Sequence, residues 1–113
     1  IAIGFCSNLI KLNNMPGFES GSWGYHSDDG EFFNCSIINK PYGPTFTTGD
    51  TIGCCLNFIN KTVFYTKNGV NLGKYYLILN FIYLNGNLFP CIGLKGGSIK
   101  TNFGQKKFIY AGM

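Results

Sequence analysis

The stretch PYGPTFTTGDTIGCCLNFINKTVFYTKNGVNLG, residues 41–73, decides the fold of this chain. Apolar residues recur at every second position from Ile52 to Phe58, which is the spacing of one face of a β-strand. The same alternation returns in the run that follows the Asn60-Lys61 pair. Asn tolerates a positive φ angle better than most residues, so this pair suits a tight reversal of the chain. The stretch therefore predicts a β-hairpin over residues 51–66.

The composition around this hairpin indicates a single folded β-domain. The chain has 113 residues, which suits one domain over residues 1–113. Hydrophobic residues make up 45% and charged residues only 12%, so a packed core is possible and disorder is not expected. Aromatic residues reach 17% and glycines number 16, a balance that favours strands and turns over helices.

Charge and hydropathy argue against two classes of partner. The formal net charge of +4 arises from scattered lysines, because the chain contains no arginine. Arginine is the residue expected for bidentate contacts to phosphate and guanine, so nucleic acid is not an expected partner. The longest apolar run, Tyr75 to Leu84, is about half of the ~20 residues that a helix needs to span a bilayer, so no membrane segment is expected.

The cysteines indicate a reducing compartment. There are five of them, an odd number, and their spacing fits neither a zinc site nor a regular disulfide framework. Cys54 and Cys55 point to opposite faces of one predicted strand, and we interpret them as small apolar residues. No secretory signal stands at the start of the sequence. We therefore expect an intracellular location, cytoplasmic or nuclear.

Other short strands are predicted between frequent Gly and Asn turns. They cover residues 1–6, 23–26, 31–35, 88–94, 98–104 and 106–113, with turns at Ser27–Gly30 and at Lys95–Gly97. The 88–94 and 98–104 segments are expected to pair as a hairpin. The segment Lys74 to Asn87 is apolar without a clean period, so both helix and strand remain open for it. The pattern predicts a β-sandwich or a β-barrel.

Several of these motifs, in this order, resemble a known family. They are GSWGYHSDDGEFF (21–33), PYGPTFTTGD with GCC after it, FYTKNG, and LFPCIGL followed by TNFGQKKF. Together they resemble the SPRY domain, and within that family the branch of the Ran-binding protein M-like scaffold subunits of CTLH ubiquitin ligases. The resemblance implies an all-β, bent antiparallel sandwich of concanavalin-like type, whose loops at one end bind short segments of partner proteins. It implies no catalytic activity and no cofactor, and it implies other ubiquitin ligase subunits as partners of the full-length protein.

The chain departs from the family pattern in two places. The first strands of the family have no counterpart before Ile1, so the resemblance implies a SPRY domain that is incomplete at its N-terminus. Uncovered strand edges would then favour self-association. Lys74 to Asn87 is longer and more apolar than the corresponding family segment, and we expect it to be buried against the sandwich rather than to form an exposed patch.

The resemblance places the peptide-binding pocket on three stretches of the chain. The residues carried over are Met15, Pro16, Phe18, Tyr25, His26, Asp28, Asp29, Phe32, Phe33, Leu94, Lys95, Gly96 and Gly97. An alternative is that Trp23, Tyr25 and Phe33 belong to the core, and we favour the core for Trp23. Gly96 stands where relatives that bind Asn-rich peptides have a bulky aromatic residue, so that specificity is not carried over. Lys95 would instead favour an acidic segment.

The chain has few acid–base groups, one His and five carboxylates, and we do not expect an enzyme. Asp28 and Asp29 are adjacent in a predicted turn, whereas paired catalytic carboxylates face each other across a cleft. The acidic tract also lacks the alternating ligands of a calcium loop, so no metal site is expected. A lectin-like sandwich that binds carbohydrate through the same aromatic and Asn side chains is the alternative function.

Overall fold

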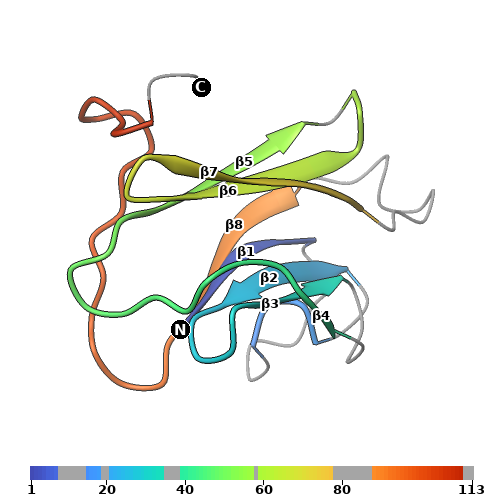
Figure 1. Cartoon of the computed structure of the whole chain (residues 1–113), viewed down its shortest axis with the longest axis horizontal. Coiled ribbons are helices and arrows are strands. Elements are labelled where there is room, and N and C mark those ends of the chain that lie inside the picture. Colours follow the sequence, from blue (N-terminus) through green and yellow to red (C-terminus); the bar gives the residue numbers. More distant parts are fainter. Residues whose placement is uncertain (8–14, 19–20, 35–38, 58, 78–87, 111–113) are drawn as a thin grey trace.

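The computed structural model contains two antiparallel β-sheets packed face to face (Figure 1). It describes residues 1–7, 15–18, 21–34, 39–57, 59–77 and 88–110. The strands are β1 (Ala2–Ser7), β2 (Ser22–His26), β3 (Glu31–Asn34), β4 (Asn39–Pro41), β5 (Ile52–Asn57), β6 (Thr62–Lys67), β7 (Val70–Tyr76) and β8 (Leu88–Gly93). One sheet, here called sheet A, has the order β4-β3-β2-β1-β8, and the other, sheet B, has the order β5-β6-β7. The described residues include no helix, and so none that could cross a membrane, and the all-β prediction is confirmed.

The predicted hairpin is the pair β5–β6 of sheet B. Cys55 lies opposite Phe64 in its register. The residue that takes the left-handed conformation in the reversal is Lys61, with φ 55°, rather than Asn60. The next turn, Asn68-Gly69, leads into β7. Both of its residues have positive φ, as a type I′ two-residue hairpin loop requires.

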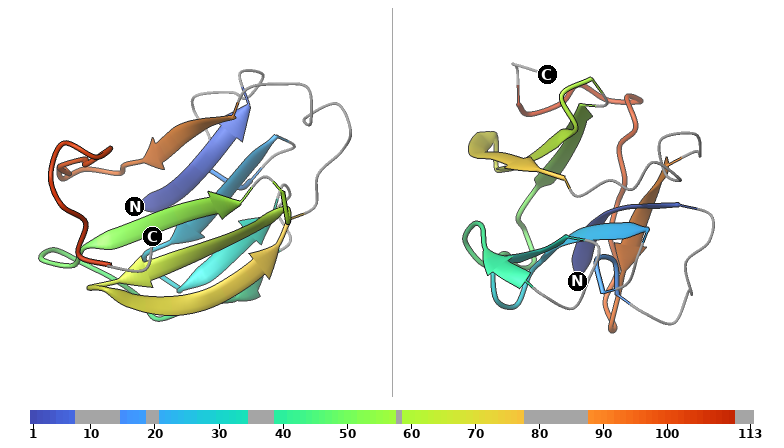
Figure 2. Two further views of the ribbon diagram at one scale, coloured as in Figure 1. Left: turned by 90° about the horizontal axis from the view of Figure 1, so that it is seen from above. Right: turned by 90° about the vertical axis from the view of Figure 1, so that its right-hand side faces the viewer.

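An aromatic core fills the space between the two sheets, which Figure 2 shows edge-on in its right-hand view. Trp23 is completely buried and stacks on Phe5, with ring centroids 5.0 Å apart. Tyr65 of sheet B reaches across, packs on Tyr25 at 5.1 Å, and donates a hydrogen bond from Oη to the Ile3 carbonyl at 2.8 Å. The interpretation of Trp23 as a core residue is therefore confirmed.

The predicted hairpin of 88–94 with 98–104 is wrong. Strand β8 pairs instead with β1, so that Cys91 lies opposite Gly4. Residues 98–104 form no strand, because the Asn102 side chain provides a competing local turn. Its Oδ1 accepts hydrogen bonds from the backbone amides of Gly104 at 2.9 Å and Lys106 at 3.1 Å. Residues 106–110 form no strand either, and residues 111–113 lie outside the described residues.

The structure describes residues 74–77 of the apolar segment that follows residue 73. Strand β7 extends through it to Tyr76, so the strand alternative holds for its beginning. Tyr75 and Leu77 pack against the core, in agreement with the expected burial, while Tyr76 is exposed. Residues 78–87, like Cys35 and Phe58 of the predicted strands, lie outside the described residues.

Strands β5 and β8 are edges of their sheets. Pro90 lies within β8, and a proline has no N–H to donate, which is tolerated at an edge. Ile52 and Cys54 of β5 are only partly buried, although they belong to the inner face of the sandwich. That further strands of the family complete this side, and that the chain self-associates through these edges, both stay predictions.

Candidate functional site

The first element of the site is the segment Met15 to Phe18, which lies on the face of sheet A that points away from sheet B. Glycines on that face make room for it, since a Cβ built on Gly24 would lie 2.4 Å from the Pro16 carbonyl oxygen. A Cβ built on Gly93 would lie 2.2 Å from the Met15 sulfur. Pro16 is consequently buried. Because Gly24 and Gly93 have no side chains, the segment can lie directly against the strands of sheet A.

A small aromatic cluster on the same face of sheet A also fixes this segment. The rings of Phe18 and Phe33 are 4.8 Å apart, and those of His26 and Phe33 are 4.2 Å apart. His26 Nε2 donates a hydrogen bond to the Pro16 carbonyl at 2.8 Å, which assigns the proton to this nitrogen. His26 and Phe33 are buried, but Phe18 is 37% exposed. Phe18 is therefore the residue of this cluster that reaches the surface.

The acidic turn Ser27–Gly30 lies at the adjoining end of the sheet, at the left of Figure 1. Asp28 and Asp29 are both exposed. Asp29 Oδ1 accepts a hydrogen bond from the backbone amide of Glu31 at 2.9 Å, so one of the two carboxylates organises the turn itself. Asp28 presents its charge to solvent.

The loop Leu94–Gly97 lies at the same end. Gly93 is opposite Ala2, and Ala2 is opposite His26, so the end of β8 and the end of β2 are neighbours across β1. Leu94 is 43% exposed, and Lys95 is exposed beside it. Gly96 and Gly97 both have positive φ, at 81° and 76°, which explains the glycine pair as a sharp turn.

The structure corrects two of the predicted contact residues. Tyr25 and Phe32 are completely buried in the core and cannot touch a partner. The prediction treated residues 25–33 as one stretch, whereas alternate residues of a strand point to opposite faces of the sheet. Pro16, His26 and Phe33 are buried as well and act as supports. The exposed set that remains comprises Phe18, Asp28, Asp29, Leu94, Lys95, Gly96 and Gly97, with Met15 partly exposed.

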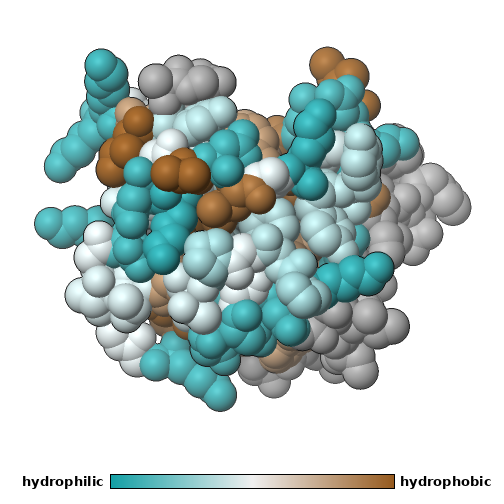
Figure 3. Space-filling model, in the orientation of Figure 1, coloured by the Kyte–Doolittle hydropathy of each residue, from teal (hydrophilic) through white to brown (hydrophobic). Residues whose placement is uncertain are grey.

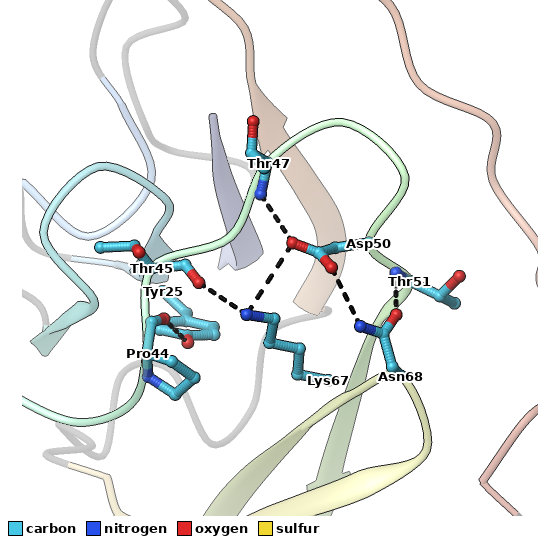
Figure 4. A network of polar contacts seen from close by, with 8 residues as sticks. All are labelled: Tyr25, Pro44, Thr45, Thr47, Asp50, Thr51, Lys67 and Asn68. Carbon is cyan, nitrogen blue, oxygen red and sulfur yellow. Dashed lines mark hydrogen bonds and ion pairs between the residues drawn. The ribbon is translucent and has the colours of Figure 1, made fainter.

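One loop at this end was missing from the predicted site. Residues 42–50 attach to the acidic turn, because the amide of Phe46 donates to the Ser27 carbonyl at 3.2 Å and that of Gly43 to the Gly30 carbonyl at 2.9 Å. Tyr25 Oη donates to the Pro44 carbonyl from below (Figure 4). The density of Pro, Gly and Thr without any alternation was the signal that this stretch is an ordered loop.

A polar network around Asp50 fastens this loop to sheet B (Figure 4). Asp50 accepts hydrogen bonds from Asn68 Nδ2 and from the Thr47 amide, both at 2.9 Å, and Lys67 Nζ lies 3.9 Å away. Lys67 also donates to the Thr45 carbonyl at 2.9 Å. The hydrogen bond from Asn68, that from Thr47 and the nearby ammonium lower the pKa of the Asp50 carboxyl below its ordinary value of 3.8.

The Asp50 network predicts a loss of stability in acid. A carboxyl whose pKa is lower in the folded state than in the unfolded state stabilises the fold above its unfolded pKa, and this contribution is lost as the pH falls through the folded value. Chemical unfolding between pH 2 and pH 7 should therefore show a steeper acid limb for the wild type than for Asp50→Asn. The control is Asp28→Asn, in an exposed carboxylate of the neighbouring turn. Identical acid limbs for wild type and Asp50→Asn would contradict the assignment.

Burial raises the pKa of three thiols, those of Cys54, Cys55 and Cys91, and so keeps them protonated. The pKa of Cys54 and that of Cys91 rise to about 12. A nucleophilic cysteine needs the opposite shift. Within the described ranges, no group of three or more His, Cys, Asp or Glu residues is placed to hold a metal ion. The end of the sandwich that carries residues 15–18, 27–30, 42–50 and 94–97 is here called the loop end. Its surface presents the apolar side chains of Phe18 and Leu94 together with charged ones, Asp28 and Lys95.

Comparison with known proteins agrees with the fold and the motifs. The SPRY domain family model matches residues 1–106. The chain is 47% identical to Ran-binding protein 10 of Danio rerio over 112 residues, which cover 97% of this chain and 18% of that protein. It is likewise 47% identical to Ran-binding protein 9 of Homo sapiens, covering 97% of this chain and 15% of that protein. The Ran-binding protein M homolog of Arabidopsis thaliana is 37% identical, with 97% and 23% covered.

A solved structure shares the architecture. The crystal structure of a human SPRY domain superimposes with a TM-score of 0.65 at 28% identity, covering 79% of this chain and 56% of that one. The chain spans less than a quarter of the length of each of the relatives named above. The similarity is therefore to one domain of larger proteins.

Proposed function

This chain belongs to the SPRY family, and from that premise we propose that it binds short segments of partner proteins through the loops at one end of its sandwich. The observation that supports this best is a pair of exposed apolar side chains, Phe18 and Leu94, on loops that the fold holds in place. Charged groups of both signs, Asp28 and Lys95, flank them. Apolar anchors with a polar rim are the usual composition of a peptide-binding surface.

Three of the loops are well suited to this role because hydrogen bonds already order them: residues 15–18, the acidic turn and residues 42–50. Binding to an ordered loop avoids the entropy cost of immobilising it. Gly17 illustrates the point, since its amide donates to Ser22 Oγ at 2.9 Å and so ties the Phe18 segment to β2. The acidic turn and the 42–50 loop brace each other in the same way.

Lys95 defines the expected chemistry of the partner. It is the exposed lysine next to Leu94, so a segment with an apolar side chain followed or preceded by a carboxylate would match both. A single exposed charge contributes modestly to affinity, so Lys95→Glu should weaken acidic peptides by about three- to tenfold. The measurement is fluorescence polarisation with peptides selected from a phage library on the wild-type chain. Lys100→Glu, an equal change of charge on the exposed tail, is the matched control.

Three results would distinguish peptide binding at the loop end from the alternatives. An unchanged Kd for Lys95→Glu would remove Lys95 from the site. Peptides that bind Phe18→Ser and Leu94→Ser as tightly as the wild type would reject the loop end altogether. Capture of glycans on an array, with no peptide selected, would favour the carbohydrate-binding alternative.

We further propose that the whole protein is a scaffold in a ubiquitin ligase, with other ligase subunits as partners and without catalytic activity of its own. The support is the resemblance to Ran-binding protein M-like scaffolds and the identity of 47% to Ran-binding proteins 9 and 10. The raised thiol pKa values and the engaged His26 fit a binding role. Affinity purification of the full-length protein, followed by identification of the copurified subunits, tests this role.

A further inference from the structure

A second concave surface lies on sheet B, on the face that points away from sheet A. Cys55, Phe64 and Lys74 form one row across β5, β6 and β7 in the strand registers. Their neighbours Val63 and Tyr65 are buried in the core, so this row faces outward. The row forms the floor of a groove of about 520 Å³.

Two walls of the groove come from distant parts of the sequence. One is the C-terminal tail, whose Tyr110 ring packs edge-on against Phe64 at 5.7 Å. Asn71 Nδ2 donates to Tyr110 Oη at 3.4 Å and holds that ring against β7. The other wall is the β5–β6 turn, where the side chain of Ile59 is 92% exposed. In Figure 3 an apolar projection stands over this turn at the upper right, and the tail lies at the upper left.

The polar groups that line this groove are mainly hydrogen-bond donors. Asn57 Oδ1 already accepts from the backbone amides of Ile59 and Asn60, both at 3.0 Å, so its Nδ2 group is the part left for a ligand. Lys74 of β7 adds an exposed ammonium group. Lys61, which follows the lining residue Asn60 in the β5–β6 turn, is exposed as well. No carboxylate is among the described residues that line the groove.

The described carboxylates lie elsewhere in the molecule. Asp28, Asp29 and Glu31 belong to the β2–β3 hairpin of sheet A. Asp50 precedes β5, where it accepts hydrogen bonds from Asn68 and Thr47. Asn57 is at the other end of β5, and the length of the strand separates the two residues by about 20 Å. Salt screens charges beyond about 8 Å under physiological conditions, so these carboxylates do not neutralise the groove. Among the described residues, the charged group that lines the groove is therefore the Lys74 ammonium.

From these observations we propose that the groove bounded by Ile59, Phe64, Lys74 and Tyr110 binds a second protein segment, an acidic one with an aromatic side chain. The aromatic side chain packs against the surface that Phe64 and Tyr110 form together, and the carboxylates accept from Lys74 and Asn57. The groove is on the opposite sheet from the Phe18 and Leu94 surface, so one chain of this kind can hold two segments at once. The proposal does not depend on the proposed function of the loop end.

The test uses the 113-residue chain and a fluorescein-labelled hexapeptide of five glutamates with phenylalanine at the third position, read by fluorescence polarisation. Wild type is expected to bind it, Lys74→Glu to bind at least tenfold more weakly, and Tyr110→Ser at least threefold more weakly. Lys100→Glu, an equal change of charge on the exposed tail, should leave the Kd unchanged. Lys95→Glu is measured beside it and reports whether the probe binds at the loop end instead. Thermal unfolding of each variant reports on the fold, and Tyr110→Ser supplies the decision if Lys74→Glu is unfolded.

Several results would overturn this assignment. One is the absence of binding at millimolar peptide. Another is a Kd that responds to Lys95→Glu and not to Lys74→Glu or Tyr110→Ser, which would place the probe at the loop end. A third is equal affinity for a probe with serine in place of phenylalanine. That result would mean that the probe binds through attraction between charges alone and that the groove does not recognise an aromatic side chain.

Discussion

Replacement of Tyr65 by alanine is expected to cost about 3 to 5 kcal/mol of unfolding free energy, the usual range for truncating a buried aromatic residue. Tyr65 is completely buried and belongs to β6, the central strand of sheet B. Its ring contacts Tyr25, Phe32 and Tyr42 at centroid distances of 5.1, 6.0 and 5.7 Å. Small domains are stable by only about 5 to 15 kcal/mol, so the variant should be largely unfolded at modest denaturant concentration.

The Tyr65→Phe variant separates packing from hydrogen bonding. It keeps the ring and removes the bond to the Ile3 carbonyl, which links the two sheets. A loss of about 0.5 to 1.5 kcal/mol is expected, because one hydrogen bond is removed and its acceptor stays in a partly buried place. Burial raises the pKa of Tyr65 well above 10, so the hydroxyl is neutral and this difference should not change between pH 6 and pH 9.

Urea unfolding followed by far-ultraviolet circular dichroism measures both variants. Tyr76→Ala is the matched control, since Tyr76 is an aromatic residue on the adjacent strand but is 71% exposed. It should change the unfolding free energy by no more than about 0.5 kcal/mol. A wild-type-like transition for Tyr65→Ala would mean that the two sheets are not held together by this residue.

The β5–β6 hairpin was predictable because its information is local. Alternation from Ile52 to Phe58 identifies the inner face, and the turn residues are contained within the same stretch. The pairing of β8 with β1 was not predictable in this way, since the choice of partner depends on strands some 85 residues apart. In the tail, the strand-like composition of 98–104 was overridden by one side chain, Asn102, which satisfies the backbone amides locally.

The candidate site, too, was predictable only in part. Resemblance to the family identified the three stretches, and the structure brings two of them together through Pro16 and His26. The resemblance could not say which side chain of each strand points outward. The predicted site therefore included Tyr25 and Phe32, which the structure buries. The groove on sheet B was missed entirely, because Phe64 and Tyr110 are distant in the sequence and no motif connects them.

Replacement of Gly24 by alanine is the change expected to affect partner binding most while the sandwich stays folded. The added Cβ would lie 2.4 Å from the Pro16 carbonyl oxygen and 2.9 Å from the Pro16 carbonyl carbon and Cβ. These are atoms of a buried residue and not the end of a flexible side chain, so the segment that carries Phe18 must move outward. Overpacking of this kind costs about 1 to 3 kcal/mol. The bond from His26 to Pro16 would be lost with it.

Gly93→Ala provides the graded comparison. The nearest atom to its added Cβ is the Met15 sulfur at 2.2 Å, which a flexible side chain can move, and only the edge of the Pro16 ring, Cδ at 2.8 Å, resists it. We expect peptides selected for the loop end to bind Gly24→Ala at least tenfold more weakly than wild type and Gly93→Ala about threefold more weakly. Nuclear magnetic resonance spectra should place the large shift changes at residues 15–18 and leave β5, β6 and β7 unchanged. Unaltered peptide affinity in Gly24→Ala would show that the position of Phe18 does not matter for binding. The loop end would then have to act through Leu94 and Lys95 alone.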